Sequence, residues 1–70
     1  MMPLTMARKG ETVTIQGITG KDEVRQHLAE LGFLVDGEIT VVSQIGGNLI
    51  LQVKDGRVAL DRSMANRIMI

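Results

Sequence analysis

The sequence predicts a small, mainly β domain with one short α-helix, folded as an antiparallel β-barrel of about five strands. Short segments of alternating apolar and polar residues are separated by tight turn signals, a pattern typical of antiparallel strands. One segment alone has the apolar spacing of an amphipathic helix. The chain has 70 residues, which predicts a single domain over residues 1–70.

The first strand is expected from Glu11 to Ile18. Val13 and Ile15 alternate there with polar residues, which is the period of a half-buried strand. Before this strand, Leu4 and Met6 are expected to pack the start of the chain onto the fold.

A helix of about ten residues is expected next. Val24, Leu28 and Leu31 follow one another at i, i+4 and i+7, so they form one apolar stripe. Thr19 or Gly20 is expected to cap the start of this helix. A helix this short depends on packing rather than on intrinsic propensity.

The helix is expected to end at Gly32, because glycine readily adopts the left-handed conformation that closes a helix. Phe33 follows directly and is the only aromatic residue of the chain. As the largest apolar side chain, it is expected to occupy the centre of the core.

Turn signals divide the rest of the chain into a meander, a helical turn and a last strand. Strands are expected at residues 38–44, 49–54, 57–60 and 68–70. Turns are expected at Asp36-Gly37, Gly46-Gly47-Asn48 and Asp55-Gly56. A helical turn is expected at residues 61–66, with Asp61 or Ser63 as its cap and with Met64 and Ala65 facing inward. Such tight hairpins require antiparallel pairing. Closure into a barrel would remove exposed edges.

Composition argues against several functions. Eight Lys and Arg balance eight Asp and Glu, whereas a nucleic-acid binder normally carries a basic excess. Aromatic residues make up 1% of the chain, which disfavours base stacking and an adaptor groove for Pro-rich peptides. The chain has no cysteine, no apolar run long enough to span a bilayer and no secretory signal in MMPLTMARKG. A cytoplasmic location is therefore expected.

Four segments in order resemble the FeoA family of small proteins in bacterial ferrous iron transport. They are Lys9-Gly10-Glu11, RQHLAELGF from Arg25, Gly37-Glu38-Ile39 and VALDRSMANRIMI from Val58. The resemblance spans nearly the whole chain. Asp61 departs from the small or basic residue that relatives often carry, and Asp36 stands where many relatives have proline.

The resemblance implies an SH3-like barrel and a partner, the membrane transporter FeoB with its cytosolic GTP-binding domain. It also extends to the C-terminal module of iron-dependent repressors. The residues expected to support this architecture are Gly10, Leu31, Gly32, Phe33, Gly37 and Ala65.

No catalytic constellation is present in the sequence, so we expect no enzyme and no cofactor. Glu23, His27 and Glu30 are spaced i, i+4 and i+7 on the expected helix, and imidazole with carboxylates can ligate a divalent transition metal. The alternative, which we favour, is a solvated helix face carrying a surface histidine.

A partner surface is expected along the edge of the helix. Leu34, Ile50 and Met69 fall outside the inward alternation, and Arg25 lies away from the Glu23/His27/Glu30 strip. Leu28 is expected to belong to the same surface. The leading hypothesis is thus a non-enzymatic module that docks on the transporter. The alternative is a metal-responsive regulatory domain that binds a divalent metal or a transcriptional regulator.

Overall fold

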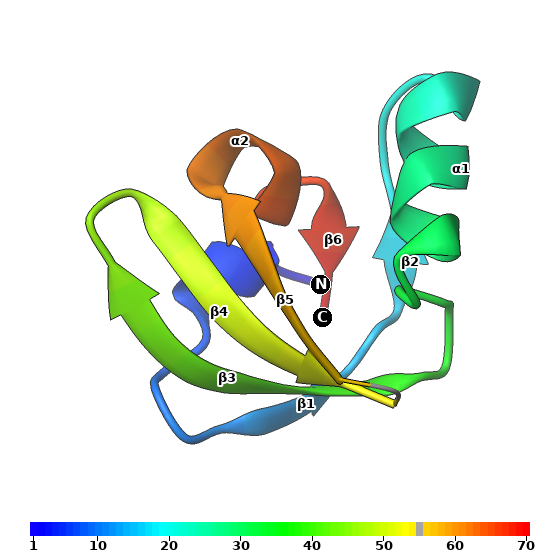
Figure 1. The fold of residues 1–70 in the computed structure, drawn as a ribbon. Coiled ribbons are helices and arrows are strands. Elements are labelled where there is room, and N and C mark those ends of the chain that lie inside the picture. The colour runs from blue at the N-terminus through cyan, green and yellow to red at the C-terminus, as the bar shows by residue number, and fades with distance from the viewer. Residues whose placement is uncertain (55) are drawn as a thin grey trace.

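The computed structural model describes residues 1–54 and 56–70 (Figure 1). In chain order, its elements are the 3-10 turn η1 (Leu4–Met6), β1 (Thr12–Thr14), β2 (Gly17–Ile18), α1 (Asp22–Glu30), β3 (Glu38–Ile45), β4 (Asn48–Val53), β5 (Gly56–Asp61), α2 (Arg62–Ala65) and β6 (Ile68–Met69). The prediction of a mainly β fold with one short helix, a meander, a helical turn and a last strand is confirmed.

The strands form two antiparallel sheets. One has four strands in the order β1-β3-β4-β5, and the other pairs β2 with β6. The β3–β4 hairpin turns at Gly46, whose φ is +60°. The next hairpin pairs Val53 with Gly56. The predicted Asp55-Gly56 turn includes Asp55, which lies outside the described residues.

The prediction of one strand from Glu11 to Ile18 is wrong, because the chain changes sheet in the middle of this segment. The Ile15 N–H donates to the Gly37 carbonyl at 2.9 Å, and the Ile15 carbonyl accepts from the Asp36 N–H at 2.8 Å. The Gln16 N–H already donates to the carbonyl of Met69 in β6, at 2.7 Å. Alternation alone does not show which neighbour a strand will pair with.

The expected closure into one barrel with about five strands also needs correction. The last strand, β6, pairs with β2 and not with the four-stranded sheet. Among the described residues, β1 and β5 therefore remain edge strands, since no ladder joins them to a further strand. In the part of the chain that the structure describes, six strands surround one core (Figure 1).

The start of α1 differs from the prediction as well. Lys21 is the N-cap, and its side chain makes no capping hydrogen bond. The Thr19 hydroxyl and N–H both donate to the carbonyl of Arg67, at 3.3 and 2.7 Å, so this side chain anchors the chain next to β6 instead of capping the helix. Gly20 has a φ of +114° and forms part of the turn that leads into α1.

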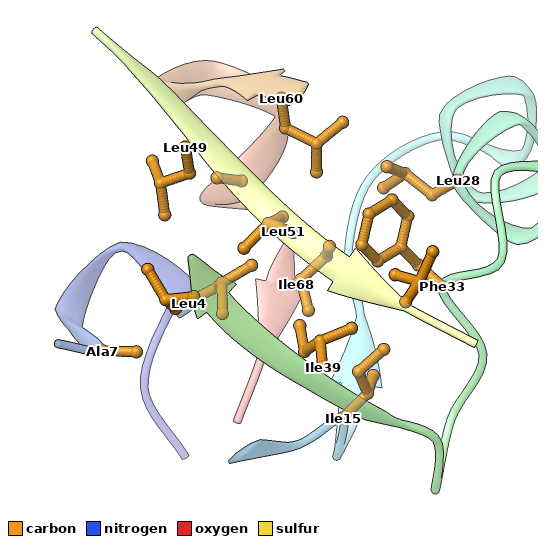
Figure 2. Packing of buried hydrophobic residues seen from close by; sticks show 13 residues of the cluster. Leu4, Ala7, Ile15, Leu28, Phe33, Ile39, Leu49, Leu51, Leu60 and Ile68 are labelled. Atoms are coloured by element: carbon orange, nitrogen blue, oxygen red, sulfur yellow. The ribbon is translucent and has the colours of Figure 1, made fainter. Parts of the chain in front are cut away.

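A single core lies between the sheets, η1 and α1 (Figure 2). Its buried members are apolar and come from nearly every element: Leu4, Ala7, Ile15, Leu28, Phe33, Ile39, Val41, Leu49, Leu51, Val53, Leu60, Ala65 and Ile68. The expected burial of Leu4 is confirmed, whereas Met6 is 65% exposed. Met6 ends the one-turn η1 and points away from the side that Leu4 buries.

Asp61 is the N-cap of the helical turn α2, which settles the choice between the two expected caps. The Asp61 Oδ1 accepts from the Met64 N–H at 2.8 Å. Met64 is half-buried against the core and Ala65 is fully buried, as expected. Within the described part of the chain, no helix has the length and apolar character required to cross a membrane.

Candidate partner-binding surface

The surface begins where α1 ends. The Gly32 N–H donates to the Ala29 carbonyl at 3.0 Å, and the Phe33 N–H donates to the Leu28 carbonyl at 3.0 Å. This pair of bonds is the Schellman arrangement, which needs a left-handed residue at Gly32, and its φ is +104°. The apolar contact that accompanies this motif is made by Phe33 and Leu28, which lie side by side in the core (Figure 2).

A tight turn follows from Leu34 to Gly37. The Gly37 N–H donates to the Leu34 carbonyl at 2.9 Å, and Asp36 has a φ of +72°. A positive φ at the third residue is the requirement of a type II turn, and aspartate tolerates it better than most residues. Proline cannot adopt this φ, so the turn that forms here excludes proline at position 36.

The turn is held rigidly against the fold. Its two hydrogen bonds to Ile15 fix Asp36 and Gly37 next to the point where the chain changes sheet. A Cβ at Gly37 would lie 2.9 Å from the Leu34 carbonyl oxygen, so the close approach requires glycine. The turn therefore presents Leu34 and Val35 in a fixed orientation.

Leu34 and Val35 are 57% and 55% exposed. Leu34 lines a pocket of about 310 Å³ together with Gly32, Gly37, Glu38 and Lys54. We call this site the turn pocket. Two of its five lining residues are glycines, so backbone forms part of its wall. Adjacent exposed apolar side chains beside a hollow are typical of protein interaction sites.

The turn pocket carries one charge of each sign. Glu38 opens β3 and Lys54 follows β4, and both are exposed. Neither forms an ion pair with any described residue. The site therefore offers an apolar side chain, a carboxylate and an ammonium group to a ligand, which suits a folded surface or peptide of mixed character.

The predicted partner residues are scattered over the molecule. Leu34 lies at the turn pocket, while Arg25 is on α1, where it contacts Asp22 at 3.9 Å. Half-buried Ile50 is on the outer face of the four-stranded sheet, and half-buried Met69 is in β6. The assignment of Leu28 is wrong: it is fully buried, because it faces Phe33 on the apolar stripe of α1.

The metal hypothesis receives no geometric support. Glu23, His27 and Glu30 are all exposed on α1. Among the described residues, no three His, Cys, Asp or Glu side chains are grouped so that they can hold an ion. Glu23 and Glu30 lie seven positions apart, about 10 Å along a helix axis. In the described part of the chain, no second element completes a metal site with them.

Sequence reasoning missed Val35, Glu38 and Lys54 as surface residues of the site. The apolar pair directly before Asp36-Gly37 was a usable signal for Val35, since a turn exposes the residues that form it. Lys54 carried no such signal, because its neighbours in the pocket come from a distant part of the chain.

The expected structural residues occupy supporting positions. Gly10 has a φ of +87°, and its N–H donates to the Val41 carbonyl at 2.6 Å. Leu31 packs against the core from α1 and Ala65 is fully buried.

Solved structures share this architecture over almost the entire chain. The crystal structure of an iron uptake regulatory protein, FeoA, superposes with a TM-score of 0.88 at 28% identity, covering 97% of this chain and 90% of that one. A FeoA from Stenotrophomonas maltophilia, described as a prokaryotic SH3 domain protein complexed with zinc, has a TM-score of 0.85 at 27% identity and coverages of 99% and 88%. The SH3-like fold class is thereby confirmed.

A manganese-dependent transcriptional repressor contains the same fold. Its TM-score is 0.86 at 22% identity, and the match covers 94% of this chain but 38% of the repressor. The likeness to metal-dependent repressors therefore concerns the fold of one of their parts.

Sequence comparison leads to the same family. A protein of Methanocaldococcus jannaschii, provisionally named Fe(2+) transport protein A, is 29% identical over 70 residues, which are all of this chain and 85% of the relative. The model of the FeoA domain family matches residues 2–70. The expected resemblance is confirmed, and the chain belongs to the FeoA domain family.

Proposed function

We propose that this protein is a non-enzymatic cytoplasmic accessory protein of ferrous iron uptake, which docks on the cytosolic GTP-binding part of a FeoB-like membrane transporter and modulates its GTP use or assembly. Family membership and the name of the M. jannaschii relative support the iron uptake role. The observation that carries the docking role is the exposed Leu34-Val35 turn beside the turn pocket.

Docking gains from covering this turn. Burial of a leucine or valine side chain yields about 1.5–3 kcal/mol when the whole side chain leaves water. More than half of each side chain is still exposed. Because hydrogen bonds to Ile15 already hold the turn, little conformational entropy is lost when a partner covers it.

The two charges of the turn pocket would orient the partner. Glu38 lines the pocket from the start of β3 and Lys54 from directly after β4, and neither is ion-paired with another described residue. Exposed charges of this kind contribute more to association rate and specificity than to affinity. We therefore expect the binding to weaken moderately with salt, while its apolar part remains.

The test is an NMR titration of the ¹⁵N-labelled protein with the purified cytosolic GTP-binding part of the transporter, with and without nucleotide. We expect shifts that cluster on residues 32–38 and Lys54. A double variant, Leu34→Ala with Val35→Ala, should weaken binding by tenfold or more, which corresponds to about 1.4 kcal/mol.

Ile45→Ala is the matched control. Ile45 is 65% exposed and lies at the far end of β3 from Glu38, about 23 Å away for a strand of this length. This variant should bind within about twofold of the wild type. Equal losses for both variants, or shifts that avoid the turn pocket, would disprove docking at this site. An absence of shifts at near-millimolar partner would overturn the choice of target.

A metal-responsive regulatory role is the second candidate. The S. maltophilia relative was solved in complex with zinc, and His27 is exposed between two carboxylate residues on α1. Because the three side chains do not converge, we expect added Zn²⁺ to leave the His27 resonances unmoved and added Mn²⁺ to leave the melting temperature unchanged. A binder at 100 times its Kd would add about 2.7 kcal/mol to the unfolding free energy, so a clear melting shift would favour the metal-responsive role.

A further inference from the structure

The outer edge of β5 has unused backbone hydrogen-bonding groups. The β4–β5 register pairs Val53 with Gly56, Leu51 with Val58 and Leu49 with Leu60. In the β3–β4 hairpin, Ile45 pairs with Asn48 across a two-residue turn, so the alternate residues Asn48, Ile50 and Gln52 bond to β3.

Leu49, Leu51 and Val53 consequently bond to β5. The backbone groups of Gly56, Val58 and Leu60 face β4, and those of Arg57 and Ala59 face outward. The Asp61 N–H also faces outward, whereas the Asp61 carbonyl accepts the first hydrogen bond of α2. Among the described residues, no further strand pairs with this edge.

This edge lacks several of the protections that edge strands often have. The opposite edge of the sheet, β1, is only three residues long, and short edges give little template for pairing. β5 has six residues and contains no proline or lysine. Its register with β4 shows no bulge. In Figure 1, β5 is the last strand of this sheet and lies beside β4.

The side chains of this edge are complementary to themselves. Ala59 lies midway between Arg57 and Asp61, and all three are exposed. In an antiparallel pairing about a twofold axis at Ala59, Arg57 of each copy faces Asp61 of the other. The two charges lie about 13 Å apart within one strand, too far to pair with each other.

We propose that β5 is the contact through which two copies of this protein associate, by antiparallel pairing about a twofold axis at Ala59, so that the two four-stranded sheets become one continuous sheet. The outward N–H and C=O groups at Ala59 bond to each other across the axis. The small Ala59 side chains permit close approach at the centre, and the two Arg57–Asp61 pairs set the register.

Both charged groups have atoms available for this pairing. The Arg57 Nε donates to the Gln52 Oε1 at 3.2 Å, which orients the guanidinium, and its terminal N–H groups bond to no described residue. The Asp61 Oδ1 accepts from the Met64 N–H, and the second oxygen is left for a partner. Neither side chain forms an ion pair with a described residue.

Sedimentation velocity over a wide concentration range tests the association. We expect a concentration-dependent rise in sedimentation coefficient, together with slower amide exchange at Ala59 in the concentrated sample. Ala59→Pro removes the central donor at a position where an edge strand tolerates proline, and it should abolish both effects without changing the circular dichroism spectrum.

A mixing experiment tests the register. Arg57→Glu and Asp61→Arg each place like charges opposite each other in a homodimer, so each variant alone should remain monomeric. When the two variants are mixed, the side chains at positions 57 and 61 that face each other in a heterodimer are again of opposite charge. The two variants should therefore associate with each other. Arg8→Glu, which makes the same charge change at an exposed residue outside β5, should associate like the wild type.

Three results would overturn the proposal: a single monomeric species at all concentrations, association that Ala59→Pro leaves intact, or no recovery in the mixture. A further result would be a shift of the Ala59 resonance that occurs only when the transporter domain is added and never when the concentration of this protein alone is raised. That result would mean that the β5 edge pairs with a strand of the transporter and not with a second copy. Loss of self-association without loss of transporter binding would leave the docking proposal in place.

Discussion

Phe33 is the largest fully buried side chain of the core, and it directly follows the glycine that ends α1. Its ring lies beside Leu28, on the side of the core that α1 covers (Figure 2). Its complete burial confirms that it is a core residue. The Phe33 side chain therefore joins the end of α1 to the core.

Phe33→Ala should lower the unfolding free energy by about 3–5 kcal/mol, since it removes an aromatic ring and leaves a cavity. Small domains have total stabilities near the low end of about 5–15 kcal/mol, so this variant should be largely unfolded at moderate temperature. Thermal melts followed by circular dichroism measure the effect. An unchanged midpoint would refute it.

Gly32→Ala should destabilise the protein by about 1–2 kcal/mol, because an alanine at a φ of +104° is strained. The matched control is Gly17→Ala. Gly17 lacks a positive φ, and a Cβ there would meet no atom within 4 Å. This control should be neutral or slightly stabilising. Urea denaturation of both variants gives the comparison, and equal losses would contradict the role assigned to the helix end.

Among the elements, α2 has only four residues, and its first turn depends on one side chain. Asp61→Ala should cost about 1 kcal/mol, because the Met64 N–H loses its acceptor. Ser63 was the other expected cap, and it is exposed on the helix, so Ser63→Ala should change the unfolding free energy by less than about 0.5 kcal/mol. Chemical denaturation distinguishes the two, and a larger effect at Ser63 would reverse the assignment.

The whole molecule is held by one core, although its strands belong to two sheets. Leu51 of the four-stranded sheet and Ile68 of the two-stranded sheet are both fully buried in it. The radius of gyration is 10.5 Å, close to the value of about 11 Å expected for a single compact domain of this length. The two sheets should therefore not be independent folding units.

We expect both sheets to unfold in one transition. Urea titration followed by NMR should give the same midpoint for the amides of Leu51 and Ile68. Earlier loss of the β2–β6 pair would mean that the smaller sheet opens by itself. The Thr19 N–H bonds to the carbonyl of Arg67, directly before β6, and the Gln16 N–H bonds to the carbonyl of Met69, within β6. These two bonds support the β2–β6 pair beyond its own short ladder.

The local elements of this protein could be predicted from its amino-acid sequence. The period of apolar residues marked α1 and the meander, and glycine or aspartate marked the turns at Gly32, Asp36 and Gly46, because these choices depend on backbone preferences within a few residues. Leu34 was also identified correctly as exposed, since it falls outside the inward alternation.

The tertiary structure alone decided which segments meet. It divided the segment from Glu11 to Ile18 between two sheets, buried Leu28, brought Lys54 to the turn pocket and left β5 as an open edge. Each of these results depends on contacts between residues far apart in the chain. Alternation shows which side of a strand is apolar, but the partner of that strand is chosen by how all the elements pack around one core.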